Sequence, residues 1–183
     1  MSNIQKQSKR ARILFQLFFV LTPILVCYFW LTIDTPYAYL TNAGIVQTSY
    51  DDLHNITQVP LTLTTRLIAT LVSLIYCSII MYALTKLIKL FRNYENNNIF
   101  TLENATIYQK LGYSIFYWVG GSMIYQAIMT LVLSFNNPPG QRMIAFSFVG
   151  VDFLTLIMGL VVLIISWVMK EAYILADEQN LTI

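Results

Sequence analysis

Four stretches of this chain are too long and too apolar for the core of a water-soluble protein. They cover residues 13–33, 67–85, 111–135 and 143–169. Crossing a hydrocarbon core about 30 Å thick takes about 20 apolar residues at about 1.5 Å each. The first three stretches contain no Asp, Glu, Lys or Arg, and the fourth contains only Asp152. We therefore predict one all-α transmembrane domain over residues 1–183, a bundle of four membrane-spanning helices.

The distribution of charge predicts how the chain crosses the membrane. Only 11% of the residues are charged, whereas a soluble domain usually has about 25%. Nine of the eleven basic residues precede the first span, lie between spans two and three, or follow the fourth: Lys6, Lys9, Arg10, Arg12, Lys86, Lys89, Arg92, Lys110 and Lys170. Because basic segments stay in the cytoplasm, we expect a multi-pass protein of the bacterial inner membrane with both termini cytoplasmic.

Motifs of catalysis and metal binding are missing from the sequence. The chain has no His-Glu-x-x-His, Gly-x-Ser-x-Gly or phosphate-binding loop. Cys27 and Cys77 fall inside spans without a further ligand at metal-binding spacing, and they suit small apolar packing positions. The only histidine, His54, stands beside Asp51 and Asp52 in what we interpret as a solvated outer loop. The sequence thus predicts no enzyme activity, no cofactor and no metal site.

The connection between spans two and three carries a helix-start pattern. Residues 86–92 alternate basic and apolar side chains, as expected of a helix that leaves the membrane through anionic headgroups. A turn at 93–98 follows, and then Thr101 stands as an N-cap. Glu103 lies in the first turn, where the helix dipole favours an acid, and Asn104 occupies the reciprocal capping position. We predict a short cytoplasmic helix over 101–112.

Two segments resemble a known family. Ile99 to Asn104 matches an Ile-Phe-Thr-x-x-Asn pattern, and the chain ends with acids followed by Leu-Thr-Ile. Together they resemble the small four-span bacterial membrane proteins of domain of unknown function 2975. The resemblance implies four spans and no established activity. It also implies a partner, because genes of the family often stand beside one for a small helix-turn-helix regulator.

Asp152 is the most informative residue within the spans, because a carboxylate at a helix centre costs about 2.5–3.5 kcal/mol on insertion scales. Small and polar residues of the fourth span, including Thr155, share its helical face. Gln126 lies at a similar depth, and Tyr125 and Tyr76 have hydroxyls to offer. We predict an intramembrane polar centre of these five residues. It is either structural glue or, since intramembrane carboxylates often mark relays, a proton or cation site.

Three hypotheses for function follow. The first is a non-enzymatic regulatory or signalling protein that acts through its basic loop at 86–110 and its acidic tail at 171–183, which attract each other or hold a cytoplasmic partner. The partner-binding candidates are Lys89, Arg92, Phe100, Thr101, Glu103, Asp177, Glu178, Leu181 and Ile183. The second is a small transport or ion-permeation protein that uses Asp152, and the third is a structural subunit of a membrane complex. The partners expected are the lipid bilayer, a helix-turn-helix regulator and further copies of the chain, with no direct nucleic-acid contact.

Overall fold

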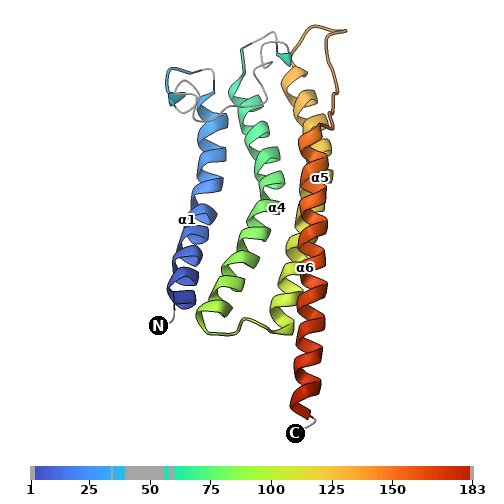
Figure 1. The fold of residues 1–183 in the computed structure, drawn as a ribbon. Coiled ribbons are helices and arrows are strands. Elements are labelled where there is room, and N and C mark those ends of the chain that lie inside the picture. Colours follow the sequence, from blue (N-terminus) through green and yellow to red (C-terminus); the bar gives the residue numbers. More distant parts are fainter. Residues whose placement is uncertain (1–2, 34, 40–55, 58–59, 182–183) are drawn as a thin grey trace. The chain divides into compact units, whose positions relative to one another are not determined.

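The computed structural model describes residues 3–33, 35–39, 56–57 and 60–181. Its long helices are α1 (Asn3–Thr32), α4 (Leu63–Glu95), α5 (Leu102–Ser134) and α6 (Gly150–Leu181), shown in Figure 1. No strand occurs in the described ranges. The predicted all-α architecture is confirmed, while His54, Asp51 and Asp52 lie outside the described residues.

The surfaces of these helices require a lipid solvent. Each of the four contains an 18-residue window apolar enough to cross a membrane, and only 6–22% of the residues in these windows are buried within the protein. A helix that is apolar all round belongs either in a protein core or in a bilayer. Since protein covers so few of these residues, the bilayer must cover the rest. The chain is a multi-pass membrane protein.

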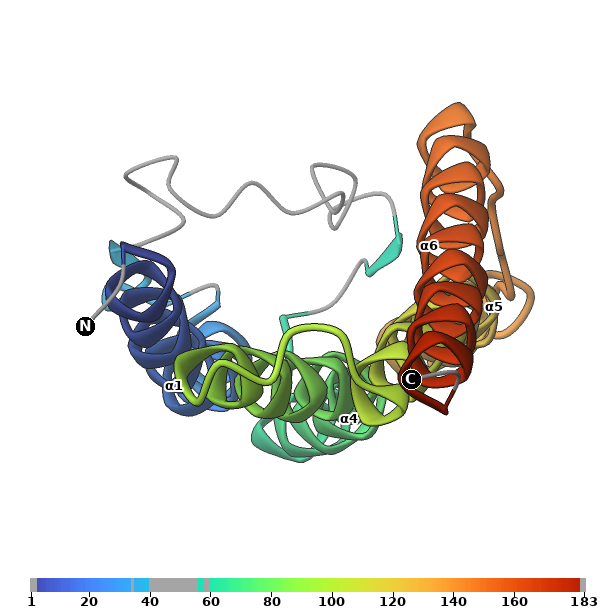
Figure 2. The same cartoon turned by 60° about the horizontal axis from the view of Figure 1, so that its bottom comes forward.

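The chain divides into two compact units. Unit 1 contains residues 1–20, 79–120 and 149–183, and unit 2 contains residues 21–78 and 121–148. Within unit 1, α4 lies between α1 and α5, and α6 lies beside α5 (Figure 2). Its core consists of Leu90, Ile107 and Leu111, with Val162 of α6 packed against them.

Glycines allow α5 and α6 to approach closely in unit 1. A Cβ built on Gly112 would lie 2.6 Å from Leu163 Cδ2, and one built on Gly159 would lie 3.1 Å from Ile115 Cγ2. The hydroxyl of Ser166 on α6 donates a 2.8 Å hydrogen bond to the carbonyl of Ala105 on α5. Small residues and interhelical hydrogen bonds of this kind drive helix association where no hydrophobic effect operates.

Unit 2 has its own apolar core. Its buried members come from α1, α4, α5 and the segment that leads into α4: Trp30, Ile33, Leu61, Ala69, Met129 and Leu133. Two asparagines just after α5 bond to the start of α4 and to the segment that precedes it. Asn136 donates to Thr65 Oγ1 at 3.1 Å, and Asn137 donates to the carbonyl of Ile56 at 2.8 Å.

Two predicted boundaries need correction. The helix expected over 101–112 does form, but it continues without a break as the first turns of α5. The fourth span, expected to be helical from Met143, becomes helical only at Gly150. Residues 141–149 are non-helical because their backbone bonds to polar side chains of α5, as described below.

Candidate functional site

The turn between α4 and α5 is built around one buried side chain, Asn104, which is 0% exposed. Its amide group donates to the carbonyls of Asn98 at 2.6 Å and Ile99 at 2.8 Å. Its carbonyl oxygen accepts a 2.8 Å hydrogen bond from Asn93, and its backbone N–H donates to Thr101 Oγ1 at 3.2 Å. The predicted N-cap at Thr101 is confirmed. Asn104 serves the preceding turn rather than forming the reciprocal half of a capping box.

Two ion pairs involve residues next to this turn. Lys89 Nζ lies 2.6 Å from Glu103 Oε1, and Asn93 donates to the other carboxylate oxygen at 2.8 Å. Glu103 lies outside the apolar run of α5, which begins at Leu111. Hydrogen bonds from Lys89 and Asn93 hold the pKa of the Glu103 carboxyl below its ordinary value. On α1, Arg12 Nε pairs with Glu95 Oε2 at 2.8 Å.

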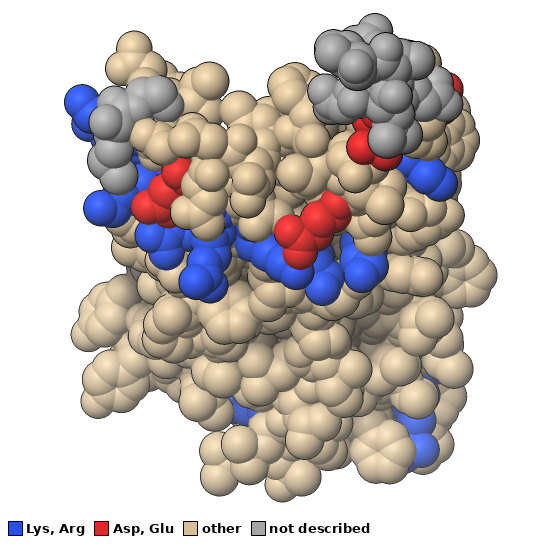
Figure 3. Space-filling view, turned by 90° about the horizontal axis from the view of Figure 1, so that it is seen from below, with Lys and Arg blue, Asp and Glu red and all other residues tan. Residues whose placement is uncertain are grey.

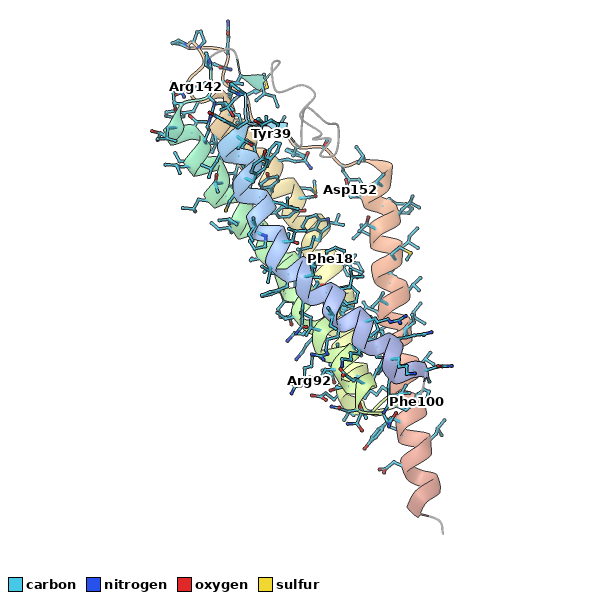
Figure 4. The ribbon with its side chains drawn as sticks, turned by 90° about the vertical axis from the view of Figure 1, so that its left-hand side faces the viewer. Phe18, Tyr39, Arg92, Phe100, Arg142 and Asp152 are labelled. Carbon is cyan, nitrogen blue, oxygen red and sulfur yellow. The ribbon has the colours of Figure 1, made fainter. Side chains whose placement is uncertain are left out.

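We call residues 3–12, 86–110 and 170–177 the charged end of unit 1. Figure 3 shows Lys and Arg side chains gathered there, with acidic side chains among them. All three of Lys89, Glu103 and Arg92 are exposed, and the first two form an ion pair with each other. Phe100 is 67% exposed and lies with Arg92 at this end (Figure 4). The charged end thus presents an aromatic on a fixed turn and a guanidinium in the last turn of α4.

The tail continues α6 as a helix through Leu181. Lys170, Glu171 and Asp177 are exposed. In the ranges that the structure describes, no ion pair joins the tail to the basic loop at 86–110. The side chains of Glu178 and Leu181, and all of Ile183, lie outside the described residues.

Of the five residues of the predicted polar centre, Tyr76, Tyr125 and Gln126 belong to unit 2, and Asp152 and Thr155 belong to unit 1. Two of those in unit 2 contact each other. The rings of Tyr76 and Tyr125 stack with centroids 4.7 Å apart. Tyr125 Oη lies 2.9 Å from Ser73 Oγ, which accepts a 2.7 Å hydrogen bond from Trp30 Nε1. This buried chain of polar groups links α1, α4 and α5 and can act as interhelical glue.

Gln126 belongs to a second polar feature of unit 2, a ladder between α5 and the non-helical segment 141–149. Gln126 Oε1 accepts a 3.1 Å hydrogen bond from the Ser147 N–H, and Gln126 Nε2 donates to the Ser147 carbonyl at 3.5 Å. One turn on, Thr130 Oγ1 accepts a 3.0 Å hydrogen bond from the Ala145 N–H. Its own proton has acceptors in the Gln126 carbonyl of α5 at 3.0 Å and the Ala145 carbonyl at 3.3 Å.

The ladder continues at Ser134, whose hydroxyl accepts from the Met143 N–H at 3.1 Å and donates to its carbonyl at 3.2 Å. Four helical residues advance about 6 Å, and two extended residues advance about 6.6 Å. A polar side chain at every fourth helical position therefore matches every second residue of the segment. The ladder gives backbone groups outside any helix the partners that hydrocarbon cannot supply.

We expected Asp152 in the middle of a membrane helix, and this position is wrong. Asp152 lies in the first turn of α6 (Figure 4). Its carboxylate oxygen Oδ2 accepts a 2.9 Å hydrogen bond from the Val149 N–H. A carboxylate at this position caps the helix and complements its dipole. Thr155, also in unit 1, donates to the carbonyl of Val151 at 2.8 Å.

The register of α5 against α6 fixes the level of Asp152 in unit 1. Ser166 faces Ala105, and the Gly159 carbonyl faces Gly112. Continued along the antiparallel pair, this register brings Asp152 opposite Val119, nine residues beyond Lys110. Nine residues correspond to about 14 Å. The first turn of α6 therefore begins well inside the apolar part of unit 1.

Sequence reasoning missed three features of these sites. It did not pair Arg12 with Glu95 or stack Phe15 on Phe91, whose centroids are 5.4 Å apart, because these contacts join residues far apart in the chain. It also missed the role of Ser134 in the ladder. The four-residue spacing of polar residues on α5 was visible, but an extended partner was not.

Among the described residues, no three His, Cys, Asp or Glu side chains come together in a way that could hold a metal. The fold and these sites define a multi-pass α-helical membrane protein with a charged end and polar side chains within its spans. The family described as "Protein of unknown function (DUF2975)" matches residues 54–183, and the chain belongs to this family. No curated protein and no solved structure matches the chain.

Proposed function

We propose that this is a non-enzymatic regulatory or signalling protein of the bacterial inner membrane, which binds a cytoplasmic partner at its charged end. The observation that carries the proposal is Phe100, 67% exposed on a turn that the buried Asn104 fixes. A large aromatic on a rigid backbone loses little conformational freedom on binding. Exposed aromatic and arginine side chains are enriched at surfaces that bind proteins.

The distribution of basic residues supports a cytoplasmic partner. The charged end contains nine of the eleven basic residues, and the positive-inside rule retains such segments in the cytoplasm. The resemblance between the family and this chain suggests the partner's class, a small soluble helix-turn-helix regulator. In this proposal the membrane protein holds the regulator through Phe100, Arg92 and the acidic tail.

Capture of the purified regulator by the full-length protein in mild detergent tests the proposal. Phe100→Ala and a deletion of residues 177–183 should each weaken capture at least about tenfold, as expected when a hot-spot contact is lost. Tyr39→Ala removes an aromatic side chain of similar exposure (65%) from unit 2 and serves as the matched control. Equal capture by Phe100→Ala and Tyr39→Ala would refute this surface.

A second candidate is cation or proton permeation at Asp152, favoured by the level at which α6 begins. Its helix N-terminus and carboxylate lie about 14 Å beyond Lys110, and interrupted helices at membrane depth are typical of transporter binding sites. In proteoliposomes, Asp152→Asn should abolish a pH-driven flux while keeping the fold, because Asn can still cap the helix. If wild type and Asp152→Asn show the same flux, this second function is wrong.

A further inference from the structure

Unit 1 contains a cavity between α4, α5 and α6. Its volume is about 160 Å³, and it is open on one side. The lining residues come from one stretch on each of the three helices: Ile79, Ile80, Ala83, Ser114, Ile115, Trp118 and Thr155. All of them lie between the charged end and the level of Asp152, in the part of the protein that lipid surrounds.

The walls of this cavity accept apolar groups only. Both hydroxyl groups in the lining donate hydrogen bonds to backbone carbonyls of their own helices. Ser114 donates to the carbonyl of Leu111 at 2.7 Å, and Thr155 donates to the carbonyl of Val151 at 2.8 Å. A water molecule needs two to four polar partners to occupy a cavity, whereas apolar cavities of about 150 Å³ stay dry and bind apolar guests. A hydrocarbon chain meets this requirement.

Two lysines stand one turn from the cavity, both toward the charged end. Lys86 follows Ala83 by three residues on α4, and Lys110 precedes Ser114 by four on α5. The two helices are antiparallel, because a connection of only six residues joins the end of α4 to the start of α5 and the helices pack side by side. Both lysines are therefore displaced from the cavity in the same direction, by about 5–6 Å along the helices.

The amines of these lysines suit a phosphate. Long lysine side chains extend their charge toward the headgroup layer while their methylenes stay in the apolar region. Within the described part of the chain, neither Lys86 nor Lys110 forms a salt bridge. The Lys86 amine lies 4.7 Å from the centre of the Tyr82 ring, which directs it without neutralising it.

We propose that this cavity and these lysines form a specific binding site for an anionic phospholipid. One acyl chain occupies the space between α4, α5 and α6, and Lys86 and Lys110 bind the phosphate and the acidic headgroup. The bilayer is the source of the ligand, since the cavity opens where acyl chains are the solvent. Basic pockets between membrane helices bind anionic headgroups by the same electrostatic attraction.

Fluorescence quenching by brominated lipids tests the site, because Trp118 lies in its wall. The chain has three tryptophans, so Trp30→Phe with Trp167→Phe leaves Trp118 as the only emitter. The matched reporter is Trp30→Phe with Trp118→Phe, which leaves Trp167, 61% exposed. Each protein is placed in vesicles containing either dibrominated phosphatidylglycerol or dibrominated phosphatidylcholine with the same acyl chains.

At Trp118 we expect the relative affinity for phosphatidylglycerol over phosphatidylcholine to be about tenfold or more, since two basic residues contribute. Trp167 lies next to Ser166, which contacts Ala105 at the charged end, so it reports the general attraction of anionic lipid to this end, and the ratio at Trp118 should exceed the ratio at Trp167. Lys86→Gln with Lys110→Gln should abolish the preference at Trp118. Lys6→Gln with Lys9→Gln makes the same change of charge on α1 and should leave the preference intact.

A second variant separates the acyl chain from the headgroup. Ala83→Leu fills the cavity and should lower quenching of Trp118 by both lipids, with Trp167 unchanged; far-UV circular dichroism checks that the helices persist. An equal preference for the two lipids at Trp118 overturns the proposal. So does a preference that survives the Lys86/Lys110 double variant, or quenching of Trp118 that Ala83→Leu leaves unaltered.

Discussion

Asn104 fixes the backbone of the α4–α5 turn at the residue scale. It accepts from Asn93 and donates to two carbonyls, and it is completely buried. Asn104→Ala leaves those groups without their partner, which costs about 1–3 kcal/mol for a buried group. We expect a lower thermal unfolding midpoint in detergent. Asn96→Ala, at an exposed position of the same turn, is the control, and an equal midpoint for both variants would contradict this role.

Gly112 is the second residue whose identity the packing dictates. Its missing Cβ would lie 2.6–2.7 Å from Leu163, so Gly112→Val overpacks the α5–α6 contact. Overpacking typically costs about 1–3 kcal/mol, and we expect a lower unfolding midpoint. Gly120→Val on the same helix adds the same atoms where no atom lies within 4 Å, and it should leave the midpoint unchanged or raised. Adding Leu163→Ala to Gly112→Val should partly restore the unfolding midpoint. A double variant with the same low midpoint as Gly112→Val would argue against direct contact between the two side chains.

At the scale of elements, the ladder holds residues 141–149 against α5. Thr130→Val keeps the shape of the side chain but removes the hydroxyl oxygen that accepts the 3.0 Å hydrogen bond from the Ala145 N–H. We expect amide hydrogen exchange of residues 143–147 to accelerate by about tenfold, as follows from losing about one hydrogen bond. Thr106→Val is the control, because its hydroxyl bonds only to the Leu102 carbonyl within the same helix. Equal exchange in both variants would show that the ladder does not order the segment.

The same element shows what sequence can and cannot predict here. Length and hydropathy were enough for four spans, and the N-cap at Thr101 followed from local chemistry. The late start of α6 at Gly150 could not be predicted, because residues 143–149 are as apolar as a membrane helix and their hydrogen-bond partners lie 9 to 21 residues away in the chain. Apolar composition reports the solvent of a segment and not its backbone conformation. The expected mid-helix position of Asp152 was wrong for the same reason, since that position depends on where α6 begins.

At the scale of the whole molecule, the distribution of charge predicts the orientation in the membrane. Moving nine basic residues across a membrane is costly, and only Arg66 and Arg142 stand on the other side of the predicted spans. In a Cys27→Ser, Cys77→Ser background, single cysteines at Lys6, Asn97 and Asp177 should react with an impermeant maleimide only after the cells are permeabilised. A cysteine at Gln141 should react in intact cells.

This labelling pattern tests the span count and the orientation together. An even number of spans puts Lys6 and Asp177 on one face, and the turn at Asn97 must share that face if the second and third spans both cross. Labelling of Lys6→Cys and Asp177→Cys from opposite sides would remove one span from the topology. Labelling of all three in intact cells would preserve the spans and reverse the orientation, and it would place the surface around Phe100 out of reach of any cytoplasmic regulator. The proposed function therefore depends on the asymmetry of charge along the chain.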